Sequence, residues 1–265
     1  MASDGTLTHP GRILWPASGE HDAVSKGDLA DYYRSAAAWM TPHLAGRPCS
    51  ILRAPEGIGG GTFLQRHLPT PGPGLGALPL DVGREAYFQI LEPRGLETLA
   101  QLSAVEIHPA NGLPFRPDSP GRLVFDLDPG PGVAFDAVVA AAHEVRARLA
   151  DVGLTGFCKT TGGRGLHVSS PLAPESPDPD WDQAGAFARR ICQAMAKAAP
   201  ERYLVTSARS GRAGRIYLDY LRNDRLATAV APLSPRARPG APVSMPLTWD
   251  QVRPGLDPAA FHIRT

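Results

Sequence analysis

The segment RLVFDLDPGPG (122–132) is the most informative stretch of the chain for fold and chemistry. Its apolar residues 123–125 predict the start of a buried strand, and the Pro-Gly pair that follows Asp128 predicts its end. Because successive side chains of a strand point to opposite faces, Asp126 and Asp128 are expected on one face and Leu127 on the other. The segment therefore predicts a pair of carboxylates on one face at the rim of a sheet.

Two neighbouring carboxylates repel each other, and a divalent cation would neutralise both. Oxygen ligands of this kind suit Mg²⁺ or Mn²⁺ and not Zn²⁺. A third carboxylate, Asp219, lies within the apolar stretch GRIYLDYLRN (214–223), where a lone aspartate is costly unless it is paired or bound to metal. The alternative for the D-x-D pattern alone is an ordinary turn at a strand end. Together, the three aspartates favour a shared metal site, with the pairing of their strands assumed.

The segment KTTGGRGLHV (159–168) joins two apolar stretches through three glycines. Glycine backbone can approach an anion closely, Arg164 adds positive charge, and Thr161 and His167 offer a hydroxyl and an imidazole. The segment is neither a Walker loop nor a dinucleotide fingerprint, because the required ending and the following helix are missing. Taken alone it is a turn; beside three carboxylates it predicts a cradle for a triphosphate.

Composition narrows the class of protein without identifying it. With 265 residues, 43% hydrophobic and 20% charged, the chain has the profile of a globular protein without a membrane span. The N-terminus has no apolar signal core, so the cytoplasm is expected, and the three cysteines, odd in number and far apart, are expected to be reduced thiols. The net charge is +1, but residues 201–240 carry eight arginines against three acidic residues, which suits a polyanion.

Hydrophobic periodicity predicts a mixed α+β fold. Helices are expected over residues 25–40, 135–152 and 181–199, the first opening with a capping box of Ser25 and Asp28. Ten strands are expected, at residues 49–53, 63–68, 86–91, 105–108, 123–128, 156–160, 166–170, 203–207, 215–221 and 227–231. Three helices cannot cover a wholly parallel sheet of this size, so the sheets should be largely antiparallel. The Pro/Gly run 69–79 is expected to be a loop.

The motifs together resemble the polymerase domain of bacterial ligase D, a member of the archaeo-eukaryotic primase superfamily. The resemblance covers nearly the whole chain and is carried by these segments: GRILWP (11–16), WMTPHLAGRP (39–48), LRAPEG (52–57), VEIHP (105–109), VFDLDPGPG (124–132), KTTGGRGLHV (159–168), LDYLRN (218–223) and ATAVAPLSPRARPGAPVSMPLTWDQV (227–252). It implies one primase-polymerase domain over residues 1–265, in which residues 1–120 wrap a catalytic core of residues 121–240.

The resemblance implies two divalent metals, Mn²⁺ or Mg²⁺, held by Asp126, Asp128 and Asp219. It also implies roles for residues outside this triad. Contacts with the nucleotide are implied for His108, Thr161, Arg164, His167 and Arg236. Contacts with DNA are implied for Arg12 and Lys26, at a 5′-phosphate, and for Phe63, on the template. The chain departs from the family's pattern in Thr161 for Ser, Arg164 for Lys and a single Phe63 where two phenylalanines are usual, which puts the template grip in doubt.

The function implied is gap filling and end extension in bacterial non-homologous end joining, with a preference for ribonucleotides. The implied partners are nucleoside triphosphates, DNA gaps, overhangs or ends with a 5′-phosphate, Ku and a DNA ligase, in the nucleoid of a bacterial cell. No ligase motif is present, which implies a stand-alone polymerase or one domain of a larger protein. Two alternatives remain: a DNA-end-bridging module with decayed catalysis, and a D-x-D nucleotide-sugar glycosyltransferase.

Overall fold

The structure is a computed structural model that describes residues 7–81, 85–172, 179–208 and 210–265. The chain forms two compact units. Unit 1 contains Met1–Pro109, Val230–Val243 and Phe261–Thr265, and unit 2 contains Ala110–Ala229 and Ser244–Ala260. The chain therefore passes from one unit to the other four times. The expectation of a single domain over residues 1–265 stays a prediction.

Unit 2 is built on a six-stranded sheet with the strand order β13-β14-β10-β12-β11-β15. Its strands are β13 (Tyr203–Leu204), β14 (Ile216–Asp219), β10 (Arg122–Pro129), β12 (Leu166–Pro171), β11 (Phe157–Thr160) and β15 (Pro246–Leu247). Every pair is antiparallel except β13 with β14. The prediction of a largely antiparallel α+β fold is confirmed.

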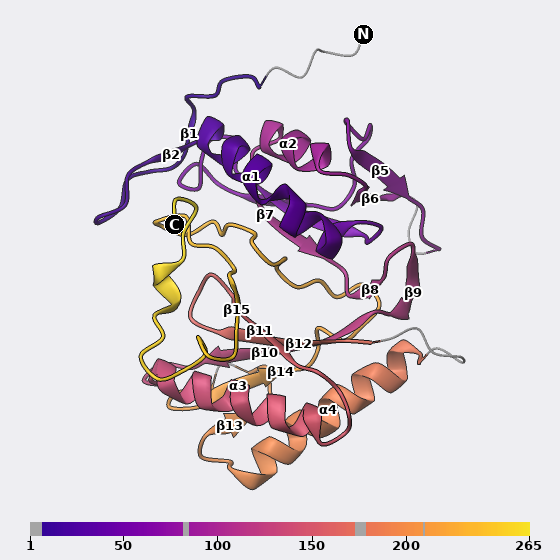
Figure 1. The fold of residues 1–265 in the computed structure, drawn as a ribbon, viewed down its shortest axis with the longest axis vertical. Helices are drawn as coiled ribbons and strands as arrows, with labels where there is room; N and C mark the ends of the chain where they lie inside the picture. The colour runs from indigo at the N-terminus through magenta and orange to yellow at the C-terminus, as the bar shows by residue number, and fades with distance from the viewer. Residues whose placement is uncertain (1–6, 82–84, 173–178, 209) are drawn as a thin grey trace. The chain divides into compact units, whose positions relative to one another are not determined.

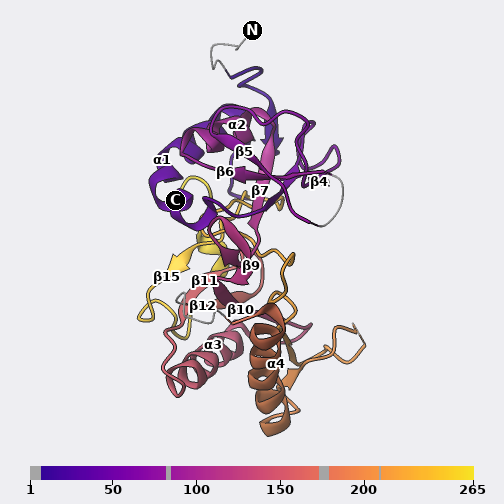
Figure 2. The ribbon, with the colours of Figure 1, turned by 90° about the vertical axis from the view of Figure 1, so that its right-hand side faces the viewer.

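Two helices cover one face of this sheet, α3 (Phe135–Ala150) and α4 (Trp181–Ala198), as Figures 1 and 2 show. Leu123 of β10 points to that face, where it meets Phe187 of α4 in a shallow apolar pocket. Alternation along β10 then places Phe125 and Leu127 on the helix side and Asp126 on the other. The face of the sheet that carries Asp126 is therefore not covered by α3 and α4.

Unit 1 has its own sheet and pair of helices. Its strands run in the order β4-β3-β6-β5, and β7 also pairs with β3. The bounds are β3 (Cys49–Arg53), β4 (Phe63–Gln65), β5 (Leu75–Leu78), β6 (Tyr87–Ile90), β7 (Ala104–Pro109), α1 (Lys26–Leu44) and α2 (Arg94–Gln101). The two helices pack side by side (Figure 1). The predicted capping box is present at the start of α1, where Ser25 and Asp28 exchange hydrogen bonds.

Short elements complete the fold. In unit 1, β1 (Ile13–Trp15) pairs with β2 (Val24–Ser25). In unit 2, β8 (Gly112–Leu113) pairs with β9 (Arg116–Pro120), and one 3₁₀ turn, η1, covers Pro258–Ala260. No helix in the described part of the chain combines the length and apolarity needed to cross a bilayer. All three cysteines are buried free thiols, as predicted.

Several predicted elements were wrong or missed. The Pro/Gly run 69–79 is not all loop, because Leu75–Leu78 pairs with β6 as β5. Residues 227–231 form no strand: Thr228 makes only an isolated bridge with Ala110, and the Ala231 N–H bonds to the Ile107 carbonyl. Helix α2 was missed, although its buried face includes Leu96 and Leu99. The helix expected over residues 135–152 is slightly shorter, since α3 ends at Ala150.

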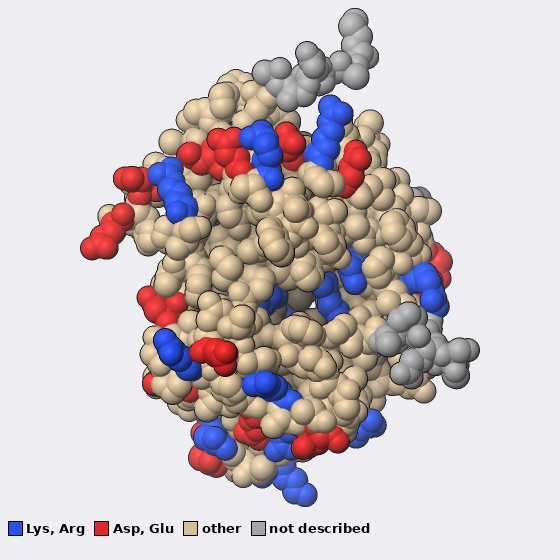
Figure 3. Space-filling view, viewed as in Figure 1, with Lys and Arg blue, Asp and Glu red and all other residues tan. Residues whose placement is uncertain are grey.

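The surface charge on the face drawn in Figure 3 does not indicate a binding partner. Acidic and basic side chains are interspersed on the face drawn in Figure 3, in keeping with the net charge of +1. That face therefore shows no broad basic surface of the kind that binds a polyanion.

Candidate functional site

A row of charged and polar side chains crosses the unit 2 sheet on the face away from α3 and α4. The strand register sets Asp219 of β14 opposite Asp126 of β10, Asp126 opposite His167 of β12, and His167 opposite Lys159 of β11. Directly opposed residues in antiparallel strands share a face, with Cα atoms about 4.5–5.5 Å apart. All four side chains are buried. The structure thus brings together two of the predicted metal ligands and the histidine of the glycine-rich segment.

Asp126 and His167 form the centre of this row. His167 Nε2 lies 3.3 Å from Asp126 Oδ1. Burial favours the neutral form of Asp126, but His167, Arg222 and Lys159 outweigh it and hold its pKa at about 2. Burial and the Lys159 charge lower the pKa of His167 to about 4. Near neutral pH the pair is therefore a carboxylate beside a neutral imidazole.

Asp128 lies on the same face two residues further along β10, opposite Tyr217. Burial, followed by the charges of Asp126 and Asp219, raises the pKa of Asp128 to about 6. Burial is also the main cause that raises the pKa of Asp219, and Asp126 adds to it. The three carboxylates therefore repel one another, and a bound cation would reduce this repulsion.

Arg222 supplies positive charge beside this cluster. Its Nη2 lies 3.4 Å from Asp126 Oδ2 and its Nε lies 3.3 Å from Asp219 Oδ2, while 39% of its side chain remains exposed. The guanidinium therefore bridges the carboxylates on the two neighbouring strands. It occupies the kind of position that a cation shared by both carboxylates would take.

The residues present fit divalent cations by their chemistry. The donors are carboxylate oxygens, and Asp126 Oδ1 is buried with no hydrogen-bond partner among the described residues. As they stand, no three or more His, Cys, Asp or Glu side chains in the described ranges are grouped as a ready metal site. Metal binding would therefore require side-chain adjustment, including displacement of the Arg222 guanidinium.

The glycine-rich segment forms the hairpin between β11 and β12 and approaches β10 closely. A Cβ atom at Gly165 would lie 2.5 Å from the Leu127 carbonyl oxygen and 3.5 Å from Asp128 Oδ1. Thr161 closes the hairpin, since its hydroxyl donates to the Gly165 carbonyl at 3.1 Å. Arg164 is exposed at the tip. The hairpin thus brings the Gly165 backbone, next to the exposed Arg164, close to the Asp128 carboxylate.

In unit 1, two predicted nucleotide-binding residues share one buried carboxylate. His108 Nε2 lies 2.7 Å and Arg236 Nε lies 3.1 Å from Glu106 Oε2. Ala237 N–H donates to Glu106 Oε1 at 2.8 Å. Burial favours the neutral carboxyl, but His108 and Arg236 hold the pKa of Glu106 at about 2. The structure therefore brings His108 and Arg236 together through a residue that the sequence reasoning did not single out.

The predicted DNA-binding residues also belong to unit 1. Arg12 donates to the Pro55 carbonyl and contacts Glu56, and Lys26 Nζ donates to the Thr8 carbonyl at 3.0 Å. Burial and the nearby charges of Arg12 and Arg53 lower the pKa of Lys26. This cluster of like charges would be relieved by an anion.

Phe63 is 46% exposed, and the Arg53 guanidinium lies over its ring at 5.2 Å from the centroid. An exposed aromatic ring beside a cation suits contact with a nucleobase. Arg53 was not singled out from the sequence. The pairing of β3 with β4 sets it opposite Phe63, and its charge also acts on Lys26.

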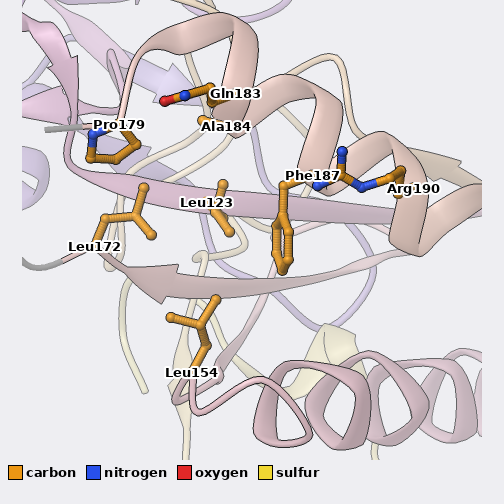
Figure 4. A pocket seen from close by; sticks show the side chains of 8 residues that line it. All are labelled: Leu123, Leu154, Leu172, Pro179, Gln183, Ala184, Phe187 and Arg190. Atoms are coloured by element: carbon orange, nitrogen blue, oxygen red, sulfur yellow. The ribbon is translucent and has the colours of Figure 1, made fainter. Parts of the chain in front are cut away.

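Other residues of the site were also missed. Lys159 and Arg222 lie inside the quoted motifs, at one end of the hairpin segment and three residues after Asp219. Glu106 carried a usable signal, because it is a carboxylate between apolar residues of an expected strand, the same signal that identified Asp219. The pocket in Figure 4 lies on the opposite, helix-covered face and takes no part in this site.

Comparison with known proteins gives consistent results. Residues 25–265 match the family described as "LigD, primase-polymerase domain". The chain is 36% identical to the multifunctional non-homologous end joining protein LigD of Mycolicibacterium smegmatis, over 97% of this chain and 33% of that protein. It is also 36% identical to the LigD protein of Pseudomonas aeruginosa, over 93% of this chain and 29% of that protein.

Among solved structures, the polymerase domain of Mycobacterium tuberculosis ligase D in complex with DNA matches with a TM-score of 0.87 and 34% identity. That match covers 98% of this chain and 91% of the solved chain. The chain thus spans about a third of the length of the curated relatives and nearly all of a solved polymerase domain.

Proposed function

Because the chain belongs to the LigD primase-polymerase domain family, we propose that it is a DNA repair polymerase that adds nucleotides to a primer 3′-hydroxyl. Its substrates would be gaps and broken ends in bacterial non-homologous end joining, the process for which its relatives are named. The observation that carries the proposal is the register of β10 and β14, which sets Asp126 opposite Asp219 with Asp128 on the same face.

Asp126, Asp128 and Asp219 would hold two divalent cations, Mn²⁺ or Mg²⁺. When bound, such cations polarise the α-phosphate and stabilise the charge on departing pyrophosphate. The chain's own contribution is to hold three carboxylates on a rigid sheet. Asp126 stays ionised near neutral pH, and the neutral imidazole of His167 faces it without competing as a second positive charge.

Five residues would contact the incoming nucleotide. In unit 2, Thr161 shapes the hairpin, Arg164 supplies an exposed guanidinium at its tip, and His167 faces Asp126. In unit 1, His108 and Arg236 are fixed by Glu106. Arginine and imidazole groups are suited to phosphate and sugar oxygens, which supports the nucleotide role.

DNA binding would involve the unit 1 residues Arg12, Lys26 and Phe63. The clustered charges of Arg12 and Lys26 suit a 5′-phosphate, and the exposed ring of Phe63 suits stacking on the template. The solved relative was bound to DNA, which supports a DNA substrate here. Ku and a DNA ligase would act with the polymerase, and ribonucleotides would be the preferred substrates.

The test is primer extension on a gapped duplex with a 5′-phosphate. We expect the chain to extend the primer with Mn²⁺ or Mg²⁺ and Asp128→Ala to lose at least ~10³-fold in rate, because a ligand that stabilises transition-state charge is removed. Asp250→Ala, which removes an exposed carboxylate, is the matched control.

Absence of extension with every metal would overturn the polymerase assignment. Gap binding that persists in Asp126→Ala, combined with an inactive parent chain, would instead favour the end-bridging module. Turnover of a nucleotide sugar would favour the glycosyltransferase alternative.

A further inference from the structure

Glu106 is a buried carboxylate that none of the nucleotide, metal or DNA roles above requires. It lies on β7 with 6% of its surface exposed. Its two oxygens divide their contacts: Oε2 faces His108 and Arg236, and Oε1 accepts the Ala237 N–H. An ionised carboxylate only accepts hydrogen bonds, so the short contact of 2.7 Å means that His108 Nε2 carries a proton and donates it. Glu106 therefore sets both the orientation of the imidazole and the position of one of its protons.

The surrounding backbone holds this arrangement in place. Next to Glu106 on β7, Ile107 N–H donates to Ser234 Oγ at 2.9 Å, and the Ile107 carbonyl accepts Ala231 N–H at 2.9 Å. Trp15 Nε1 donates to the Arg236 carbonyl at 2.8 Å. The segment that carries Arg236 is thus fixed along β7, with the Glu106 carboxylate at the junction.

The exposed fraction decreases from the imidazole and the guanidinium to the carboxylate. The side chain of His108 is 20% exposed and that of Arg236 is 18% exposed, against 7% for Glu106. His108 and Arg236 are therefore both partly exposed while they contact the same buried carboxylate. Side chains whose orientation is already fixed by hydrogen bonds lose less conformational freedom when they bind a ligand.

We propose that Glu106 is a positioning residue for nucleotide binding, which fixes the His108 imidazole and the Arg236 guanidinium in the orientation that the nucleotide's phosphates and sugar require. This inference rests on the proposed function, in which His108 and Arg236 contact the nucleotide. Glu106 itself touches neither nucleotide nor metal, and it acts through the other two residues.

The central test is Glu106→Gln, which keeps the size of the side chain and an oxygen acceptor but removes its charge. In single-nucleotide gap filling by the full chain, we expect the KM for the nucleotide to rise about tenfold or more, with kcat changed by less than about threefold. A purely structural role predicts the reverse: fewer folded molecules lower the apparent kcat and leave KM unchanged, and that result would overturn the proposal. Glu97→Gln, on the exposed side of α2, is the matched control and should leave KM unchanged.

Introducing Glu106→Gln into a doubly substituted chain tests whether Glu106 acts through the other two residues. If Glu106 acts through His108 and Arg236, then Glu106→Gln should raise KM no further in a chain that already carries His108→Ala and Arg236→Ala. A further rise of similar size in that chain would contradict the proposal.

The remaining outcomes distinguish the two levels of failure. If His108→Ala and Arg236→Ala raise KM but Glu106→Gln does not, the positioning role is wrong and the nucleotide role of the other two residues stands. If His108→Ala and Arg236→Ala leave KM unchanged, both roles are wrong, although extension by the parent chain would still support the polymerase. Melting temperatures of all variants show whether any loss reflects unfolding.

Discussion

The side-chain amide of Asn223 forms hydrogen bonds in both directions with the backbone of Val124. Val124 N–H donates to Asn223 Oδ1 and Asn223 Nδ2 donates to the Val124 carbonyl, each at 2.8 Å. Val124 precedes Asp126 by two residues on β10, and Asn223 follows the end of β14 at Asp219. A side chain therefore continues the ladder where the strand stops, and it ties together the two segments that carry the facing carboxylates.

Replacing Asn223 should destabilise the protein and disturb the metal site. Asn223→Ala leaves the N–H and carbonyl of Val124 buried without these partners, so we expect a loss of about 2–4 kcal/mol in the free energy of unfolding. Urea denaturation measures this, and calorimetric titration should show weaker Mn²⁺ binding. Asp224→Ala, at the exposed neighbouring position, should change stability by less than about 0.5 kcal/mol. Equal stability of the two variants would contradict the structural role of Asn223.

Asp128 should make the metal-free protein sensitive to pH. Its pKa in the folded protein is about 6, against an ordinary value of 3.8, so ionisation in the folded state is unfavourable. The folded state therefore loses stability as the pH rises from about 4 through 6. With EDTA present, Asp128→Asn should melt at a higher temperature than the parent at pH 7.5 and at the same temperature near pH 4. A difference independent of pH would show that the carboxyl is not the cause.

Adding Mn²⁺ at pH 7.5 should make the parent melt at a higher temperature than Asp128→Asn, because the cation binds the ionised carboxylate of the parent and not the amide of the variant. The same measurement at pH 5 should show a smaller stabilisation of the parent, since protonation competes with the metal.

Arg222 should act as a partial substitute for metal charge. Arg222→Gln leaves Asp126 and Asp219 without the guanidinium that lies 3.3–3.4 Å from them, so we expect a lower melting temperature in EDTA. Because the side chain is partly exposed, the loss should be modest, about 1 kcal/mol. Mn²⁺ should raise the melting temperature of the variant more than that of the parent. An equal rise in both would mean that the guanidinium does not compete for the site.

Gly165 should not tolerate a side chain. Gly165→Ala places a Cβ atom 2.5 Å from the Leu127 carbonyl oxygen, so the hairpin must move away from β10. We expect primer extension to fall by at least about tenfold, because small displacements of binding groups are costly in catalysis. Gly59→Ala, where a Cβ atom meets nothing within 4 Å, is the matched control. Full activity of Gly165→Ala would show that the hairpin does not contribute to the site.

Local rules were sufficient for the parts of the fold that short segments determine. The shared face of Asp126 and Asp128 follows from the two-residue period of a strand, and the start of α1 follows from the capping box of Ser25 and Asp28. The glycine-rich hairpin was likewise placed correctly between two strands.

The parts that were missed depend on contacts between distant segments. Glu106 accepts a hydrogen bond from Ala237, 131 residues later, and no local pattern predicts that pairing. The strand at Leu75–Leu78 exists because β6 supplies its partner, despite the glycines and prolines around it. The direct facing of Asp126 and Asp219 is also a matter of strand register, which the sequence suggested only through the apolar context of each residue.

The path of the chain has a practical consequence for the history of this protein. Since the backbone leaves and re-enters each unit, neither unit could have been gained or lost by joining genes end to end. A fragment that ends before Val230 would lack Arg236 and also β15, the strand that pairs with β11. Ribosomal synthesis must also proceed beyond Ser244–Ala260 before unit 2 has all its parts, and through Phe261–Thr265 before unit 1 does. The two units are therefore expected to complete their folding only once Phe261–Thr265 has left the ribosome.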